Sequence, residues 1–264
     1  MIVVNDGDDP QTAALFHRPK WNLNIRFIEI GKSHQGVARN EGVKEVNGKY
    51  VLFIGDDIFL DAGCCEKHLI AHEGYETRVT RHENDDTGNS KLETRNVAVL
   101  GFTTWDPACG ITPVMKWLES SGWQFGYPMI AKYAHQFLPP EVQHRFSYTS
   151  NISVPADVAR AHPFLNNVHL YGWEDIEWGK RKKEAGIRVF YEPDAKALHH
   201  HHIELEDSLK RMETLGRSLV HLESIVPDLD MRPTGLKLLG YGWTAMLPTM
   251  TGKHRKAFLR GLTK

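Results

Sequence analysis

Residues 50–57 read Tyr-Val-Leu-Phe-Ile-Gly-Asp-Asp, five apolar residues followed at once by a glycine and two carboxylates. An unbroken apolar run of this length is typical of a strand buried on both faces of a parallel sheet. Asp56 and Asp57 then lie at the carboxyl edge of that sheet, where open α/β sheets bind ligands. Adjacent carboxylates repel, and a divalent cation, Mg²⁺ or Mn²⁺, would offset the repulsion. The alternative is a solvated turn without a ligand.

Short strands and helices alternate on both sides of this stretch. Short connections between strand, helix and strand predict a right-handed α/β unit with a Rossmann-like, mostly parallel sheet flanked by helices. A polar loop is expected at 83–93 and an irregular, ligand-facing region at 103–150. The pattern predicts strands at 2–4, 25–30, 50–54, 97–102 and 187–191, and helices at 11–18, 37–46, 64–72, 176–185 and 203–226.

The composition narrows the class of protein. With 264 residues, 41% hydrophobic and 25% charged, the chain is typical of a globular protein, and its net charge of −1 argues against a globally basic nucleic-acid binder. No apolar run reaches the roughly 18 residues of a membrane-spanning helix. The three cysteines lack metal-ligand spacing, and the first residues do not resemble a signal peptide. We therefore expect a cytoplasmic location.

Positive charge is concentrated at the C-terminus. Residues 231–264 contain seven lysines and arginines and no acid, which leaves a net charge of −8 on the rest of the chain. Such asymmetry predicts contact with an anionic surface. One interpretation is a peripheral membrane contact through this segment on the inner face of the membrane. The other is a helix packed on the acidic body of the protein.

A second acidic motif precedes the helix expected at 176–185. Gly172 and Trp173 come directly before Glu174 and Asp175. Acids in the first turn of a helix interact favourably with its dipole, so capping is one explanation. An aromatic ring beside a carboxylate is also a recurrent way to hold a sugar against a general base, which is the alternative explanation.

Four consecutive histidines occupy positions 199–202. An exposed histidine cluster often has no function, but one imidazole of this run is a candidate metal ligand.

Taken together, these motifs resemble the inverting family-2 glycosyltransferases of the GT-A fold, over nearly all of residues 1–202. The segment 3–7 is similar to the family's strand-then-acid segment, which implies that Asp6 contacts the nucleotide base. The segment 36–42 is similar to its alanine-arginine-asparagine segment, which implies that Arg39 also faces the nucleotide. Both residues are therefore expected to bind the donor.

The resemblance also assigns the metal and donor-sugar contacts. Asp57 stands in the metal motif, with Gly55 in place of its usual first aspartate, and Asp56 would contact the donor ribose or the metal. His199 lies where some relatives complete the metal site, so Mn²⁺ or Mg²⁺ is the implied cofactor. Asn151 lies in a segment that resembles the one beside the donor sugar.

The motif at 173–175 resembles the family's acceptor-site acid pair. It implies that Asp175 is the general base, that Glu174 assists catalysis and binds acceptor, and that Trp173 binds acceptor. The implied activity is metal-dependent inverting transfer of a sugar from a nucleotide-diphospho-sugar, expected to be a UDP-sugar. The implied acceptor is a hydroxyl of a glycan or lipid-linked molecule, as in polysaccharide biosynthesis.

The resemblance further implies a domain organisation. Residues 1–202 form the GT-A domain, with a nucleotide-sugar-binding half at 1–100 and an acceptor-binding half at 101–202, and residues 203–264 form a basic helical extension. The family's first strand and helix have no counterpart before Ile2. Other functions stay open: a catalytically impaired nucleotide- or sugar-binding relic, a two-carboxylate glycoside hydrolase, or a metal-binding module built on the histidines.

Overall fold

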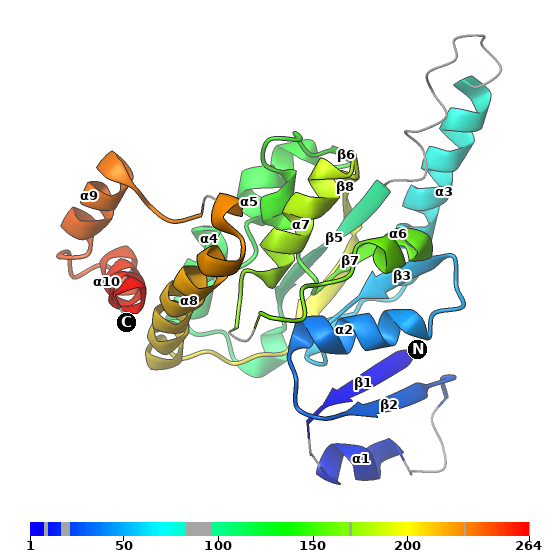
Figure 1. Cartoon of the computed structure of the whole chain (residues 1–264), viewed down its shortest axis with the longest axis horizontal. Helices are drawn as coiled ribbons and strands as arrows, with labels where there is room; N and C mark the ends of the chain where they lie inside the picture. Colours follow the sequence, from blue (N-terminus) through cyan, green and yellow to red (C-terminus); the bar gives the residue numbers. More distant parts are fainter. Residues whose placement is uncertain (8–9, 17–21, 83–96, 169–170, 230, 264) are drawn as a thin grey trace.

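The structure is a computed structural model that describes residues 1–7, 10–16, 22–82, 97–168, 171–229 and 231–263 (Figure 1). Its strands are β1 (Ile2–Asp6), β2 (Arg26–Ile30), β3 (Tyr50–Phe53), β4 (Ile58–Leu60), β5 (Val97–Trp105), β6 (Gln136–Phe137), β7 (Ile152–Pro155) and β8 (Arg188–His199). Its helices are α1 (Pro10–Phe16), α2 (Gln35–Lys44), α3 (Cys64–His82), α4 (Pro113–Ser120), α5 (Tyr127–Ile130), α6 (Ala156–Ala161), α7 (Glu174–Glu184), α8 (Leu205–Ile225), α9 (Gly235–Thr244) and α10 (Met250–Leu262). Short 3₁₀ helices are η1 (Pro107–Cys109), η2 (Ala131–Tyr133), η3 (Gln143–Phe146) and η4 (Pro227–Leu229).

The strands form two sheets. β1 and β2 pair in parallel, and a six-stranded sheet has the order β3-β7-β5-β8-β4, with β6 on β8. This confirms the α/β fold class, but the expectation of a mostly parallel sheet is wrong in detail. In the part of the chain that is described, β5 and β8 are the parallel pair of the larger sheet, and β3 pairs antiparallel with β7. The apolar run at 50–53 is therefore next to an antiparallel strand, and most of its side chains are half-buried.

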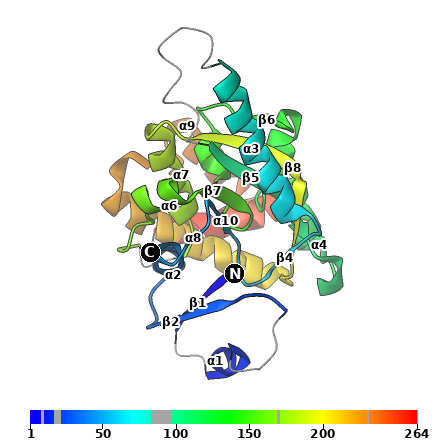
Figure 2. The ribbon, with the colours of Figure 1, turned by 90° about the vertical axis from the view of Figure 1, so that its right-hand side faces the viewer.

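Helices cover both faces of the larger sheet (Figure 2). His68 and His72 of α3 contact Asn151, just before β7, and Ser153 in β7, which point to one face of the sheet. On the opposite face, the fully buried Trp178 of α7 packs edge-to-face on the Phe53 ring, with ring centroids 5.4 Å apart. Period-two alternation along β7 thus divides the core into two layers.

β8 is longer than the strand expected at 187–191. It continues through Pro193 to His199, and the pairing with β5 shifts register between Leu100 and Phe102, opposite this proline. Proline lacks a backbone N–H and is tolerated in sheets at such irregularities. The extension matters because it brings the histidine run to the edge of the sheet where β4 begins.

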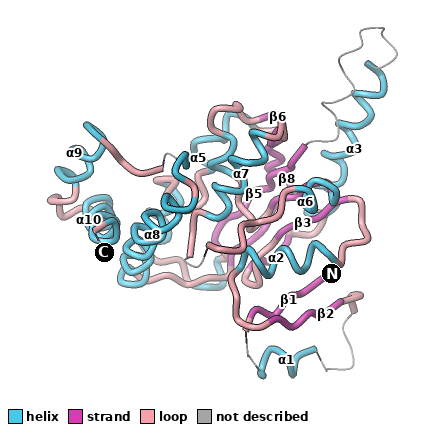
Figure 3. Tube along the Cα trace, viewed as in Figure 1, coloured by secondary structure: helices cyan, strands magenta, loops and turns pink. Residues whose placement is uncertain are grey.

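The region at 103–150 contains α4, α5, β6 and three 3₁₀ helices, so it has more regular structure than expected (Figure 3). The loop expected at 83–93 lies outside the described residues.

The C-terminal helices α9 and α10 lie at one end of the molecule, on the left in Figure 1, and β1, β2 and α1 lie along its lower edge. α10 packs closely on α8, where Gly216 and Gly261 let the two backbones approach. Buried apolar side chains form a second core there, separate from the one around the sheet: Val168, Leu219, Leu222, Leu229, Phe258 and Leu262. None of the described helices combines the length and apolar character needed to cross a membrane.

Candidate active site

One group of possible metal ligands lies at the short connection between β3 and β4, residues 54–57. β4 pairs antiparallel with β8 and aligns Ile58 with His199, so Asp57 reaches the histidine run. The Asp57 Oδ2 atom lies 2.9 Å from His199 Nε2 and 3.4 Å from His201 Nδ1. Ligand atoms of these three residues all lie within 4.8 Å of one another. The structure therefore brings Asp57 and His199 together, as expected, and adds His201.

The surroundings hold these ligands in place. The His199 ring stacks on the buried Trp105 indole with centroids 5.3 Å apart, and on His201 at the same separation. Partial burial alone would raise the pKa of Asp57, but the hydrogen bond and charge of His199, with the charge of His201, hold that pKa below its usual 3.8. Asp57 is thus kept ionised at neutral pH, as a metal ligand must be.

The two residues before Asp57 differ in their environments. Asp56 is exposed and faces solvent. At Gly55 a Cβ atom would lie 2.7 Å from the Asp57 Oδ1 atom, so a side chain there would crowd the carboxylate.

A second acidic group lies at the N-terminus of α7. The chain enters the helix through Gly172 (φ +93°) and Trp173 (φ +72°), both in the left-handed region. Glu174 Oε1 accepts hydrogen bonds from Gln35 of α2 and from Arg39 Nη1, the latter at 3.5 Å. Arg39, expected at the nucleotide, is therefore joined to an expected acceptor residue, and its guanidinium lies 5.5 Å from the Phe164 ring centroid.

Asp175, next to Glu174, has a strongly altered acidity. Burial, and then the negative charge of Glu174, raise its pKa to about 7, while the positive charge of Arg39 opposes the shift. A carboxyl group with a pKa near the working pH is suited to accept a proton as a general base. Glu174 is therefore tied to α2, whereas the Asp175 carboxylate accepts a hydrogen bond from the Ile176 amide next to it.

Two residues near Asp175 were not predicted from the sequence. The half-buried Tyr148 hydroxyl accepts a hydrogen bond from the Gly126 amide, and desolvation, followed by the negative charge of Asp175, raises the pKa of this phenol. Lys182 is 1% exposed, its Nζ lies 3.3 Å from the Trp178 ring centroid, and burial lowers its pKa well below 10.5. Lys182 stands among Lys180, Arg181 and Lys183 in the sequence, and nothing there marks it as the buried one.

Aromatic side chains lie between the two acidic groups. Phe125 contacts His199 with centroids 5.4 Å apart, and Tyr127 lies 6.2 Å from Phe125 and 5.8 Å from Tyr148. Tyr148 in turn lies close enough to Asp175 for their charges to interact. A continuous series of packed aromatic rings therefore connects the group around Asp57 with the group around Asp175.

Two other expected site residues, Asp6 and Trp173, form hydrogen bonds with other parts of the chain. Asp6 Oδ1 accepts a hydrogen bond from the Ser33 hydroxyl at 2.9 Å. The Trp173 indole N–H donates to the Leu215 carbonyl of α8 at 2.8 Å, which orients its ring toward the C-terminal helices.

Asn151 requires a correction. It is 0% exposed, its amide nitrogen donates to the Phe102 and Ala195 carbonyls, and its amide oxygen lies 2.9 Å from His68 Nε2. A side chain so enclosed links strands and α3 in the core and is not open to a donor sugar. The sequence motif gave no sign of this burial.

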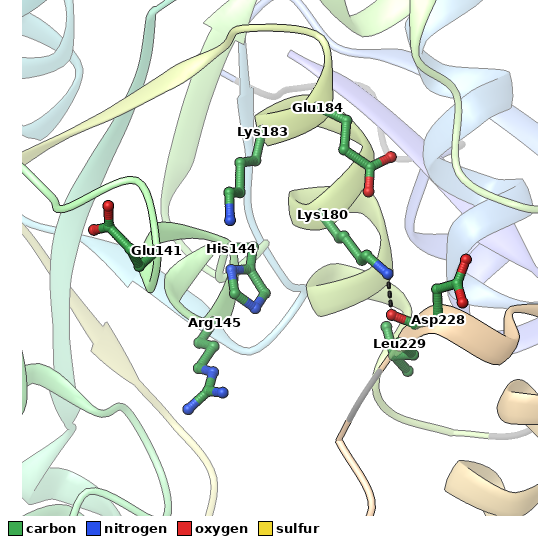
Figure 4. Close-up of a pocket in the computed structure, with 8 residues that line it drawn as sticks. All are labelled: Glu141, His144, Arg145, Lys180, Lys183, Glu184, Asp228 and Leu229. Carbon is green, nitrogen blue, oxygen red and sulfur yellow. Dashed lines mark hydrogen bonds between the residues drawn. The ribbon is translucent and has the colours of Figure 1, made fainter.

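A separate cavity of about 310 Å³ lies beside α7 and contains none of these residues (Figure 4). Charged side chains line it, and the Lys180 amine donates to the Asp228 carbonyl. Its lining is Glu141, His144, Arg145, Lys180, Lys183, Glu184, Asp228 and Leu229.

Comparisons with known proteins give a family match over part of the chain. Residues 1–107 match the model described as Glycosyl transferase family 2. This segment includes Asp6, Arg39, Asp56 and Asp57. No curated protein matches the sequence.

Solved structures give fold similarity at low sequence identity. S. aureus TarS 1–349 in complex with UDP has a TM-score of 0.50 and 12% identity, over 83% of this chain and 55% of that chain. S. aureus TarS has a TM-score of 0.51 and 12% identity, over 88% and 34%. GalNAc-T7 with UDP, GalNAc and Mn²⁺ has a TM-score of 0.48 and 9% identity, over 98% and 48%. The chain spans about half or less of these structures, and the fold is the GT-A arrangement.

Proposed function

We propose that this chain, a glycosyl transferase of family 2 by its residues 1–107, moves a sugar from a nucleotide-diphospho-sugar to an acceptor hydroxyl. The observation that carries the proposal is Asp175, a carboxyl group whose pKa is raised to about 7 beside Glu174. The Asp57, His199 and His201 group supports it. UDP is the proposed nucleotide, since a TarS structure of the same fold was solved with UDP.

The proposed metal site consists of Asp57, His199 and His201. One carboxylate and two imidazoles suit a transition ion, so the donor set favours Mn²⁺ over Mg²⁺. A bound cation would stabilise the negative charge that develops on the departing diphosphate. Exposed Asp56 contacts the donor ribose or the metal in this proposal, and Asp6 contacts the base. Trp105 keeps the His199 ring in one orientation through their stacking.

Asp175 is the proposed general base. It accepts the proton of the acceptor hydroxyl while that oxygen attacks the anomeric carbon from the face opposite the leaving group, which inverts the configuration. Glu174 binds acceptor hydroxyls, and Gln35 and Arg39 hold its carboxylate in place. Arg39 also contacts the nucleotide in this proposal, from its place beside Glu174. Trp173 lines the acceptor side.

The remaining proposals concern acceptor, location and organisation. We propose a glycan or lipid-linked acceptor, a cytoplasmic location, and peripheral membrane contact through 231–264. Residues 1–202 are the proposed catalytic domain and 203–264 its helical extension. α10 packs closely on α8, and the apolar core between them also includes Val168 from residues 1–202, so the extension is packed on the catalytic domain.

A thermal-shift experiment tests the donor site. The full chain is heated with UDP, GDP or dTDP, each with Mn²⁺, with Mg²⁺ or with EDTA. A ligand at about 100 times its dissociation constant stabilises the folded state by about 2.7 kcal/mol, which is readily measured. We expect UDP to stabilise the protein in the presence of Mn²⁺ and Asp57→Asn to abolish the effect.

The matched control is Asp61→Asn, because Asp61 is an exposed aspartate four residues away. It should leave the shift unchanged. Release of UDP from UDP-sugars, measured with and without added saccharide acceptors, then tests turnover. A folded protein that no nucleotide stabilises under any metal condition would contradict the proposal.

A further inference from the structure

A second group of possible metal ligands lies on the other side of the histidine run from the group around Asp57. Asp106 Oδ2 lies 2.6 Å from His200 Nδ1, and ligand atoms of Asp106, Cys109 and His200 all lie within 4.8 Å of one another. Asp106 and His200 are 94 positions apart in the sequence, so only the tertiary structure brings them together. The proposed function uses none of these three residues.

The extended backbone at the end of β8 separates the two groups. Successive side chains of an extended chain point to opposite sides. The rings of His199 and His201 stack on the side of Asp57 with centroids 5.3 Å apart, and His200 between them faces Asp106. Two backbone hydrogen bonds fix this arrangement, since the His200 amide donates to the Asp57 carbonyl at 2.8 Å and the Asp106 amide donates to the His199 carbonyl at 3.0 Å. One imidazole of the run is thus directed away from the group around Asp57.

The short helix η1 positions the other two ligands. Asp106 is 7% exposed, and its Oδ1 atom accepts a hydrogen bond from the Ala108 amide at 2.9 Å while its Oδ2 atom faces His200. Cys109 ends η1, and its amide donates to the Asp106 carbonyl at 3.1 Å. The Cys109 thiol is partly buried, is not in a disulfide, and forms no hydrogen bond among the described residues. The His200 side chain is 46% exposed, so an ion can reach the group from solvent.

We propose that Asp106, Cys109 and His200 bind a zinc ion, with a water molecule as the fourth ligand. Thiolate is a soft ligand that favours zinc over Mn²⁺ or Mg²⁺, and imidazole and carboxylate are also zinc ligands. Bond lengths of about 2.0–2.3 Å place tetrahedral ligands about 3.3–3.6 Å apart, so Asp106 and His200 need to separate by about 1 Å or less. On binding, the thiol proton is released to solvent, and two metal–ligand bonds replace the hydrogen bond between Asp106 and His200.

Zinc bound here would fix η1 to the end of β8. Because the Asp106 and His200 amides are bonded to the carbonyls of His199 and Asp57, the ion would also stabilise the backbone that carries the neighbouring group. The free energy of binding adds to the stability of the folded chain, since the unfolded chain does not hold the three ligands together. The proposal does not rest on glycosyl transfer.

Cobalt is the probe for this site, because Co²⁺ substitutes for zinc and a bond from thiolate to cobalt gives a charge-transfer absorption band in the near ultraviolet. The full chain is stripped of metal with EDTA, desalted, kept reduced with a phosphine, and titrated with Co²⁺ and then with Zn²⁺. We expect a thiolate band that saturates with a single cobalt ion per chain and that Zn²⁺ abolishes. The group around Asp57 contains no cysteine, so cobalt bound there adds nothing to this band.

Matched pairs of variants locate the site. Cys109→Ser should remove the band, whereas Cys65→Ser, which changes an exposed free cysteine of α3, should keep it. His200→Gln should weaken Co²⁺ binding by about 100-fold or more, because loss of even an outer-shell partner of a metal costs about 10- to 100-fold. His201→Gln should leave the thiolate band unchanged, since its ring lies on the side of Asp57.

Circular dichroism should show all four variants folded. Absence of the band from the folded, unchanged chain would overturn the proposal. A band that survives Cys109→Ser, or equal Co²⁺ affinity in His200→Gln and the unchanged chain, would do the same. The titration needs no nucleotide, so its result is independent of whether UDP and Mn²⁺ stabilise the protein.

Discussion

Replacing Asp175 by asparagine should lower turnover by about 10²- to 10⁴-fold and leave UDP binding intact, because the amide cannot accept the acceptor's proton. The substitution keeps the shape of the side chain, and the Asp175 Oδ1 atom that accepts the Ile176 amide hydrogen bond is replaced by an equivalent amide oxygen. The helix N-terminus should therefore stay in place, and the loss should be confined to chemistry.

The same substitution should change how stability depends on pH. The folded protein holds a proton on Asp175 up to a pH of about 7, whereas the unfolded chain releases it near 3.8. Because the folded state binds the extra proton between these values, stability falls as pH rises through that window. The pKa difference corresponds to about 4 kcal/mol, and we expect about 2–4 kcal/mol because Asp175 keeps some exposure.

The assays are steady-state kinetics and urea unfolding, each from pH 4 to pH 9. The unchanged enzyme should gain kcat/KM by about tenfold per pH unit below pH 7 and level off above it, as expected for a base that must be deprotonated. Asp175→Asn should be flat over the same range, and should be more stable than the unchanged protein at pH 8 but not at pH 4.

Asp157→Asn is the matched control for this experiment. Asp157 accepts a hydrogen bond from the next backbone amide at the start of α6, just as Asp175 does in α7, but it is exposed. It should leave both pH profiles unchanged. Turnover of Asp175→Asn within threefold of the unchanged enzyme would refute the base assignment, and a stability difference that is independent of pH would refute the raised pKa.

Three further substitutions test the packing of the core and of the C-terminal helices. Lys182→Met removes a buried amine without a hydrogen bond and should raise the free energy of unfolding at pH 7 by about 1–3 kcal/mol, as measured in urea. Because burial lowers the Lys182 pKa, the unchanged protein should also gain stability from pH 7 to pH 10, and this gain should vanish in the variant. Asn151→Ala should cost about 2–4 kcal/mol in the same assay; lost UDP binding at unchanged stability would instead restore a donor role. Gly216→Ala, whose Cβ would overlap the Phe258 carbonyl oxygen, should lower the melting temperature, whereas Gly240→Ala, with open space around it, should not.

Much of the architecture was predictable because it depends on local patterns. An apolar run ended by glycine and acids located β3, and acids after Gly172 and Trp173 marked the approach to α7. The adjacency of Asp56 with Asp57 and of Glu174 with Asp175 follows directly from the sequence. Strand pairing was less predictable, since a short apolar strand has the same composition beside a parallel or an antiparallel neighbour. The parallel expectation failed at β3 for this reason.

The residue types in the candidate site were evident from sequence alone, but their partners depend on contacts between distant segments. Asp57 meets His199 across 142 positions and Arg39 meets Glu174 across 135, because β8 extends past Pro193 and α2 lies against the start of α7. The enclosure of Asn151 and the low pKa of Lys182 likewise arise from burial. Burial is a property of how helices and strands pack on one another, and no local pattern of residues specifies it.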